Sequence, residues 1–218
     1  MSKAVFIVDI DSTLADHSHR LPLLKKYCSQ CGKDASAGIT LHTINLDTRV
    51  TKQICSNCDC DVLTIPTQSW ANFCQPHLMA NDAPIEKAKA VLAKARAVGT
   101  DIHFITGRSE DSRVVTEEWL TKHFGFDKRD SKLLMRAENT YTGRGVNHLP
   151  ASLHKQWCFH ELRRMCGYYG SGFLFMFFDD DMHVLDMYKQ FGLTFKAPDC
   201  WDSMVFEDQA EPELLFSR

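Results

Sequence analysis

Five short runs of apolar and β-branched residues recur along the chain, separated by segments with helical spacing. Each run is nearly continuous rather than alternating, which is typical of strands that are buried on both faces in a parallel sheet. The predicted strands cover residues 4–10, 101–106, 132–136, 173–179 and 193–197.

The segments between these strands carry signals for helix starts and ends. Residues 83–99 have a proline near the start, apolar residues at helical spacing and a closing glycine. Residues 109–125 begin with a serine and acidic residues and end with basic residues and a glycine, while 151–167 and 182–192 also end in glycine. Strands that alternate with helices of this length predict a Rossmann-like, doubly wound α/β fold around one parallel sheet.

Residues 25–66 interrupt this alternation. They contain paired cysteines, several threonines and aspartates, and no long helical pattern. We therefore expect a core formed by residues 1–24 and 67–218, with a small module inserted at 25–66. A chain of 218 residues is long enough to bury one good core with such an attachment.

Composition narrows the possible functions. With 44% hydrophobic and 24% charged residues, the chain is expected to be globular rather than disordered. Its net charge of −3 excludes a globally basic nucleic-acid surface, so any such contact would have to be a local patch. We see no apolar run of membrane-spanning length and no signal-like segment before the first strand, and therefore expect a cytoplasmic protein with no membrane partner.

Residues able to bind metal or phosphate follow several of the predicted strands. Asp9 and Asp11 end the first strand, Thr106–Arg108 ends the second, Asp179–Asp181 ends the fourth, and Lys155 lies early in the helix after the third. In an open α/β sheet, ligands bind at the carboxyl ends of the strands. Aspartates without nearby histidines suit Mg²⁺, and an aspartate can also attack phosphorus. Solvated turn formers are the alternative, but three such strand ends together favour a site.

Four of these segments resemble the motifs of the haloacid dehalogenase superfamily of phosphohydrolases, in the same order along the chain. DIDST at 9–13 resembles the first motif, ITGR at 105–108 the second, Lys155 the third and FFDDD at 177–181 the fourth. The resemblance covers about residues 1–24 and 67–202, and it implies the haloacid dehalogenase fold.

The resemblance also implies roles for individual residues. Asp9 would be the nucleophile that forms an aspartyl-phosphate, and Asp11 the general acid and then the base for water. Thr106 and Lys155 would hold the phosphoryl oxygens. Mg²⁺ would be bound by the carboxylates of Asp9, Asp179 and Asp180 and by the backbone carbonyl of Asp11.

A closer resemblance concerns the substrate. TGRSEDSRVVTEEWL, LLMR and FFDDDMHVLDMYKQFGLTF are similar to the phosphatase domain of phage polynucleotide kinase and its stand-alone relatives. That family has an arginine eleven residues after the nucleophile, which is the position of Arg20. Arg20, Gly107 and Arg108 are therefore candidate substrate-binding residues, and Arg136 is a weaker candidate for a loop contact. The alternatives are a surface arginine at 20 and an ion pair between Arg108 and an active-site aspartate. Ser12 departs from the usual glycine, so the turn must accept a side chain.

Nine cysteines are present, and four of them form two Cys-x-x-Cys pairs separated by 23 residues, Cys28/Cys31 and Cys55/Cys58. Two such pairs supply four thiolates for a structural Zn²⁺, which would serve as the core of the inserted module. Cys60 is a possible competitor for Cys58, and unrelated reduced cysteines are the plainer alternative. The insert follows the nucleophile loop, where the resemblance places a cap. A nucleic-acid contact and an oligomer contact remain alternatives.

These observations predict a Mg²⁺-dependent phosphomonoesterase acting on a nucleotide-type phosphate. The substrate is either a deoxynucleoside 5′-monophosphate or the 3′ end of a nucleic acid. The rival hypothesis is a catalytically inactive protein that binds nucleic acid or a protein partner. The intact set of Asp9, Asp11, Lys155 and Asp179 argues against the rival, because a binding domain has no need of the acid Asp11.

Overall fold

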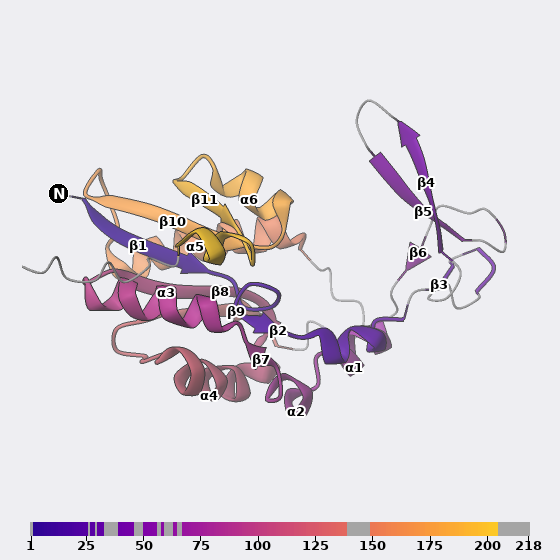
Figure 1. Cartoon of the computed structure of the whole chain (residues 1–218), viewed down its shortest axis with the longest axis horizontal. Coiled ribbons are helices and arrows are strands. Elements are labelled where there is room, and N and C mark those ends of the chain that lie inside the picture. The colour runs from indigo at the N-terminus through magenta and orange to yellow at the C-terminus, as the bar shows by residue number, and fades with distance from the viewer. Residues whose placement is uncertain are drawn as a thin grey trace, which may run out of the picture.

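A central parallel sheet organises the molecule (Figure 1). The computed structural model describes residues 2–25, 27–28, 30–32, 39–45, 50–55, 58, 63–64, 67–138 and 149–204. In these residues, five parallel strands lie in the order β11-β10-β1-β8-β9. Their bounds are β1 Lys3–Val8, β8 Asp101–Ser109, β9 Leu133–Arg136, β10 Phe173–Asp179 and β11 Leu193–Lys196.

The five strands are those predicted from the apolar runs, and the α/β fold class is confirmed. Two predicted boundaries were wrong by more than one residue: β1 ends at Val8, two residues earlier than predicted, and β8 continues past Thr106 to Ser109. The register with β9 shifts between Ile105 and Ser109, so that Ser109 pairs with Arg136. A bulge of this kind re-aims side chains without ending the strand, which a run of apolar letters cannot reveal.

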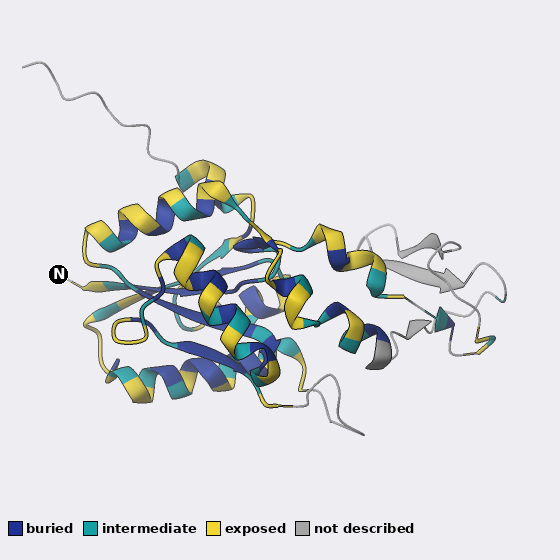
Figure 2. Cartoon of the chain, turned by 90° about the horizontal axis from the view of Figure 1, so that it is seen from below, coloured by how far each residue is buried: buried dark blue, intermediate teal, exposed yellow. Residues whose placement is uncertain are grey.

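Helices cover both faces of the sheet, as expected for a doubly wound fold. Side chains of a strand alternate between faces, and in β1 Phe6 and Val8 join one apolar cluster while Val5 and Ile7 join the other. The first cluster includes residues of α3 Glu86–Ala97, α4 Arg113–Phe124 and α7 Cys200–Met204, and the second includes residues of α5 Ala151–Cys166 and α6 Met182–Tyr188. Figure 2 shows the buried faces of these helices turned toward the buried strands.

The four predicted helices are present as α3 to α6; α3 and α4 are shorter than predicted at both ends, and α5 and α6 at the C-terminal end alone. Several shorter elements escaped prediction because each is too short to show a helical period. They are η1 Ser18–Leu23, α1 Thr67–Phe73, α2 Pro76–Met79, α7, and the paired strands β2 Ala15–Asp16 and β7 Ala83–Pro84. In the described part of the chain, no helix is both long and apolar enough to span a membrane.

The segment predicted as an insert contains two antiparallel strand pairs. β3 Tyr27–Cys28 pairs with β6 Leu63–Thr64, and β4 Ile39–Asn45 pairs with β5 Val50–Cys55. In Figure 1 these strands lie apart from the central sheet, on the side to which the carboxyl ends of its strands point. The insert is therefore placed beyond the edge of the sheet at which a ligand is expected.

A buried polar network lies at the opposite end of β8. His103 is 1% exposed, and its Nε2 lies 2.7 Å from the hydroxyl of Tyr168, which donates to Asp101 Oδ2 at 2.7 Å. The amide of Lys132 donates to His103 Nδ1 at 3.1 Å, so the neutral Nε2–H tautomer satisfies both ring nitrogens. Burial is the main cause that lowers the pKa of His103 to about 4.

The low pKa of His103 predicts that the protein loses stability in mild acid. The unfolded imidazole titrates near pH 6.5, so the unfolded chain takes up the proton first as the pH falls toward 4. His103 should therefore cost the wild-type chain about 2 kcal/mol of unfolding free energy between pH 7 and pH 5. Urea unfolding at the two pH values should show a smaller pH dependence for His103→Gln. The exposed-site control His160→Gln should retain the wild-type dependence, and an unchanged dependence in His103→Gln would contradict the prediction.

Candidate active site

Two strand ends and one helix bring together a buried cluster of charges. The amide of Asp9 donates to Phe178 O at 2.9 Å, which continues the β1–β10 ladder and fixes Asp9 at the end of the sheet. Asp179 is the last residue of β10, and Lys155 lies in the second turn of α5. The Lys155 ammonium lies 2.6 Å from Asp179 Oδ2 and 3.0 Å from Asp9 Oδ1. One buried cation thus bridges two buried carboxylates.

The cluster carries more negative than positive charge. Burial, followed by the repulsion of Asp179 and Asp180, raises the pKa of Asp9 well above its ordinary value despite the attraction of Lys155. Burial also raises the pKa of Asp180, together with the charge of Asp179. A further cation at this position would offset both effects.

The donor set fits a hard divalent cation. Carboxylate oxygens of Asp9, Asp179 and Asp180 all lie within 4.8 Å of one another. Among the described residues, none gives Asp9 Oδ1 a hydrogen bond of good geometry, although Lys155 lies at ion-pair distance. All three ligands are carboxylates, and one buried oxygen, Asp9 Oδ1, is available to an ion. Mg²⁺ prefers oxygen ligands of this kind.

Asp11 belongs to a neighbouring cluster with two arginines. Arg108 donates from Nε to Asp11 Oδ2 at 3.0 Å and from Nη2 to Asp11 Oδ1 at 2.8 Å, and Arg20 Nη2 donates to Asp11 Oδ1 at 2.5 Å. Burial alone would raise the pKa of Asp11, but Arg108 and then Arg20 outweigh it and hold the pKa well below its ordinary value. Ser12, the next residue, adopts φ 60°, so this turn does hold a side chain in the left-handed region.

The predicted substrate-binding arginines are both buried and engaged. Arg20 is 0% exposed and stacks on the ring of Phe73 at 4.2 Å, so it is not a surface residue. Arg108 forms the ion pair with an active-site aspartate that was considered as its alternative role. Arg108 and Gly107 line the cavity at this edge of the sheet, whereas Arg20 lies behind its wall.

Asp82 is one residue of the site that the sequence did not single out. Its side chain is 0% exposed and accepts from Arg20 Nε at 2.8 Å, Arg20 Nη2 at 2.7 Å and Arg108 Nη2 at 2.6 Å. The indole of Trp119 also donates to the Asp82 carbonyl at 2.8 Å. In the sequence Asp82 stands in NDAP, which is typical of a turn, and no spacing signal links it to residues 20 or 108.

Thr106 and the start of α5 are held together behind the cavity. Thr106 is 0% exposed, and its hydroxyl accepts the amide of Arg108 at 3.2 Å. His154, another residue not singled out from the sequence, lies 3.1 Å through Nε2 from the carbonyl of Thr106. Because His154 precedes Lys155, this contact fixes the first turns of α5 against β8.

A cavity of about 520 Å³ joins the two clusters. Its polar wall includes the carboxylates, Arg108, Arg136 and Lys155. Its other wall is largely apolar and comes from residues on either side of the insert and from α2: Leu24, Trp70, Phe73, Cys74 and Met79. The site therefore offers a charged end and an apolar wall to one ligand, which is typical of small-molecule sites.

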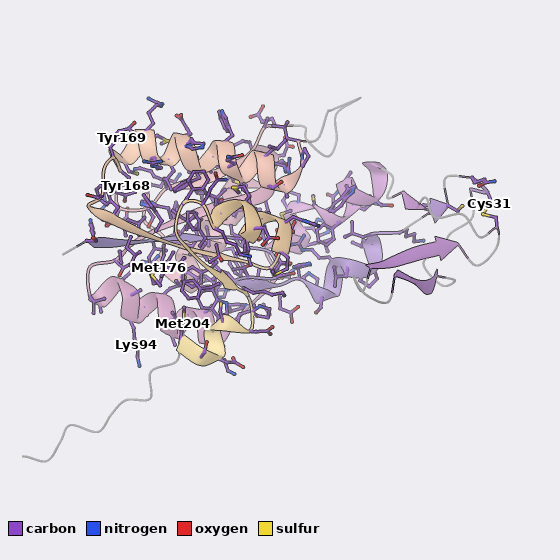
Figure 3. All side chains as sticks on the ribbon, turned by 90° about the horizontal axis from the view of Figure 1, so that it is seen from above. Cys31, Lys94, Tyr168, Tyr169, Met176 and Met204 are labelled. Atoms are coloured by element: carbon purple, nitrogen blue, oxygen red, sulfur yellow. The ribbon has the colours of Figure 1, made fainter. Side chains whose placement is uncertain are left out.

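Three of the predicted zinc ligands lie together in the insert. The thiol sulfurs of Cys28, Cys31 and Cys58 lie within 4.8 Å of one another, with 3.4 Å between Cys28 and Cys58. The Cys31 amide is the main cause that lowers the pKa of Cys28 to about 6, which favours the thiolate that binds metal. Cys55 ends β5, but its side chain, like Cys60, lies outside the described residues. Figure 3 shows Cys31 at the end of the molecule far from Tyr168 and Tyr169.

Zinc binding by this cluster predicts that the zinc content of the protein depends on its cysteines. Purified protein should contain zinc, and Cys28→Ser should lower its content because a thiolate ligand is lost. Elemental analysis would measure the content, and Cys200→Ser, on the core helix α7, is the matched control. Equal zinc content in all three proteins would contradict a site at Cys28.

No protein-family model matches the chain, and no curated protein matches it. Among solved structures, a chain of the Pnkp1/Rnl/Hen1 complex is 17% identical with a TM-score of 0.47, over 89% of this chain and 46% of that one. A hydrolase from Streptococcus pneumoniae TIGR4 is 12% identical with a TM-score of 0.45, over 89% and 92%. The class C acid phosphatase from Bacillus anthracis with tungstate bound is 15% identical with a TM-score of 0.35, over 94% and 78%. This chain spans less than half of the first of these.

Proposed function

We propose that this chain is a Mg²⁺-dependent phosphomonoesterase in which Asp9 is the nucleophile. The observation that carries the proposal is the buried ion-pair cluster of Asp9, Lys155 and Asp179 at the carboxyl ends of the strands, facing a cavity. An anionic carboxylate can attack an anionic phosphate only where cations offset the developing charge. Lys155 is one such cation, and its position beside Asp9 supports this role.

The carboxylates of Asp9, Asp179 and Asp180 would hold Mg²⁺. When bound, the ion supplies positive charge to the phosphate and to the carboxylate that attacks it. The geometry that supports this assignment is the mutual distance of at most 4.8 Å between the three oxygens. Lys155 would then be shared between the phosphate and Asp179.

Asp9 would attack phosphorus and form an aspartyl-phosphate while the bond to the leaving oxygen breaks. Asp11 would donate a proton to that oxygen and later remove one from the water that hydrolyses the intermediate. The two arginines stabilise the deprotonated form of Asp11, which is the form needed for the second step. The first step needs the protonated carboxyl, so the Asp11 side chain has to leave at least one arginine. Gly107 would complete the phosphate pocket, and Thr106 would support it from behind the cavity through the amide of Arg108.

The substrate is proposed to be a nucleotide-type phosphate, either a deoxynucleoside 5′-monophosphate or the 3′-phosphate of a nucleic acid. Trp70 supports this choice, since a half-buried aromatic side chain at the wall of a charged cavity provides a surface for a base, whereas Phe73 is buried and its ring is covered by Arg20. Arg20 and Arg108 would act on the substrate through Asp11, which both arginines hold.

The insert at 25–66 is proposed to act as a small cap held by zinc. Leu24 lies just before the insert and Trp70 just after it, and both line the cavity. A cap at this position would exclude water and select the substrate. Phosphate release from a panel of 5′- and 3′-mononucleotides and 3′-phosphorylated oligonucleotides, with and without Mg²⁺, tests the proposed function. No release from any substrate would overturn it.

A further inference from the structure

Arg136 lines the cavity and has a hydrogen-bond donor without a partner among the described residues. Among the described residues that line the cavity, Arg108, Lys155 and Arg136 carry permanent positive charge. Arg108 binds Asp11 and Asp82, and Lys155 bridges two carboxylates. Arg136 forms no ion pair with a carboxylate in the described part of the chain, which leaves its charge available to a ligand.

The guanidinium of Arg136 is anchored but not saturated. Its Nη1 donates to Leu149 O at 2.9 Å, just before α5 begins. Its Nε is buried and has no hydrogen-bond partner among the described residues. A buried N–H without a partner is costly, and an arginine has five N–H groups in a planar fork. The side chain is therefore held in place with donors to spare.

Arg136 is displaced from the reacting centre along the sheet. It ends β9, which is two strands away from β1 in the order β1-β8-β9. Neighbouring strands lie about 4.8 Å apart, so the end of β9 is roughly 10 Å from the strand end that carries Asp9. This separation leaves room for a group held by Arg136 that is distinct from the phosphate that Asp9 attacks, in the same cavity.

We propose that Arg136 binds a second phosphate of the substrate. This inference rests on the proposed phosphatase function and says which of the proposed substrates the site favours. The planar guanidinium suits phosphate oxygens, and the chain's net charge of −3 makes a local cation necessary for a substrate with two phosphates. The second phosphate is either the phosphodiester next to a 3′-phosphorylated end or the 5′-phosphate of a nucleoside 3′,5′-bisphosphate. Free 5′-monophosphates lack it.

Three substrates test this role: a nucleoside 3′-monophosphate, its 3′,5′-bisphosphate and a 3′-phosphorylated dinucleotide. Arg136→Gln should raise KM about tenfold or more for a substrate whose second phosphate it binds, with kcat little changed. KM for the 3′-monophosphate should stay at the wild-type value. A rise for the bisphosphate alone identifies the 5′-phosphate, and a rise for the dinucleotide identifies the phosphodiester.

Two further variants separate binding from folding. Arg136→Lys keeps the charge but loses the planar fork, so its KM should lie between those of wild type and Arg136→Gln. If Arg136→Gln does not fold, Arg136→Lys is compared with the wild-type chain instead. Arg164→Gln removes an exposed arginine that pairs with Glu161 on α5 and should change no KM.

The outcomes distinguish this inference from the function on which it rests. An active wild-type chain in which Arg136 variants change KM equally for all three substrates, or for none, overturns the inference alone. So does a wild-type chain that releases phosphate only from 5′-monophosphates. Absence of phosphate release from every nucleotide overturns the proposed function itself.

Discussion

Asp9→Asn is expected to abolish phosphate release while leaving the fold at least as stable as that of the wild-type chain. Asparagine is nearly the same size as aspartate but cannot form the acyl-phosphate, so the rate should fall on the order of 10⁴-fold or more. Stability should not fall, because burial and the nearby Asp179 and Asp180 already disfavour a charge at this position. Thermal unfolding without Mg²⁺ should show an unfolding temperature equal to or above that of wild type.

The matched control for this variant is Asp181→Asn. Asp181 also lines the cavity, but its carboxylate caps α6 by accepting the amide of His183 at 2.8 Å. Asparagine caps helices as well as aspartate does, so activity should stay near that of wild type. Phosphate release that survives Asp9→Asn would contradict the assignment of Asp9 as nucleophile, and an unfolded Asp9→Asn protein would contradict the predicted stability.

Asp82→Asn is expected to give the largest loss of stability among single charge changes in the site. The Asp82 carboxylate is the shared acceptor of Arg20 and Arg108, whose side chains are at most 1% exposed. Removing its charge leaves two buried guanidinium groups with Asp11 as their remaining anionic partner in the described network. Breaking a buried pair in this way typically costs about 3–5 kcal/mol. Urea unfolding at pH 7 would measure the loss, and phosphatase activity should fall with it because Asp11 loses its support.

Two comparisons show whether the loss arises from the arginines. Asp202→Asn breaks an exposed ion pair with Lys87 and should cost less than about 0.5 kcal/mol. The double variant Asp82→Asn with Arg20→Met should be less destabilised than the sum of the two single variants, since one uncompensated charge is removed. Strict additivity, or an Asp82→Asn protein as stable as the Asp202→Asn control, would show that Asp82 does not carry this network.

Much of the fold can be predicted from the sequence because a strand that is buried on both faces has to be apolar throughout. β10, with the sequence FLFMFFD, leaves little room for another interpretation, and its last residue, Asp179, marks the edge of the sheet. The same reasoning placed Asp9 and Lys155 at one edge, and the structure joins them through a distance of 3.0 Å. Local periodicity and strand ends were sufficient for this half of the site.

The second cluster could not be predicted because its partners are far apart in the chain and lie in short elements. Asp82 meets Arg20 across 62 residues and Arg108 across 26. Which buried carboxylate neutralises which arginine depends on the three-dimensional positions of η1, α2 and β8, and no spacing rule covers such a contact. The sequence also could not tell whether the arginines would face a substrate phosphate or a carboxylate, because a guanidinium forms bidentate pairs with both.

The pairing of β3 with β6 means that the chain leaves and re-enters the core at nearly the same point. Tyr27 lies opposite Thr64 in this ladder, so their Cα atoms are only about 5 Å apart. A tight turn could therefore replace everything between them without pulling on the sheet. The segment between them, which we propose to be a zinc-held cap, could thus be excised or exchanged while Asp9, Asp179 and Asp180 stay untouched.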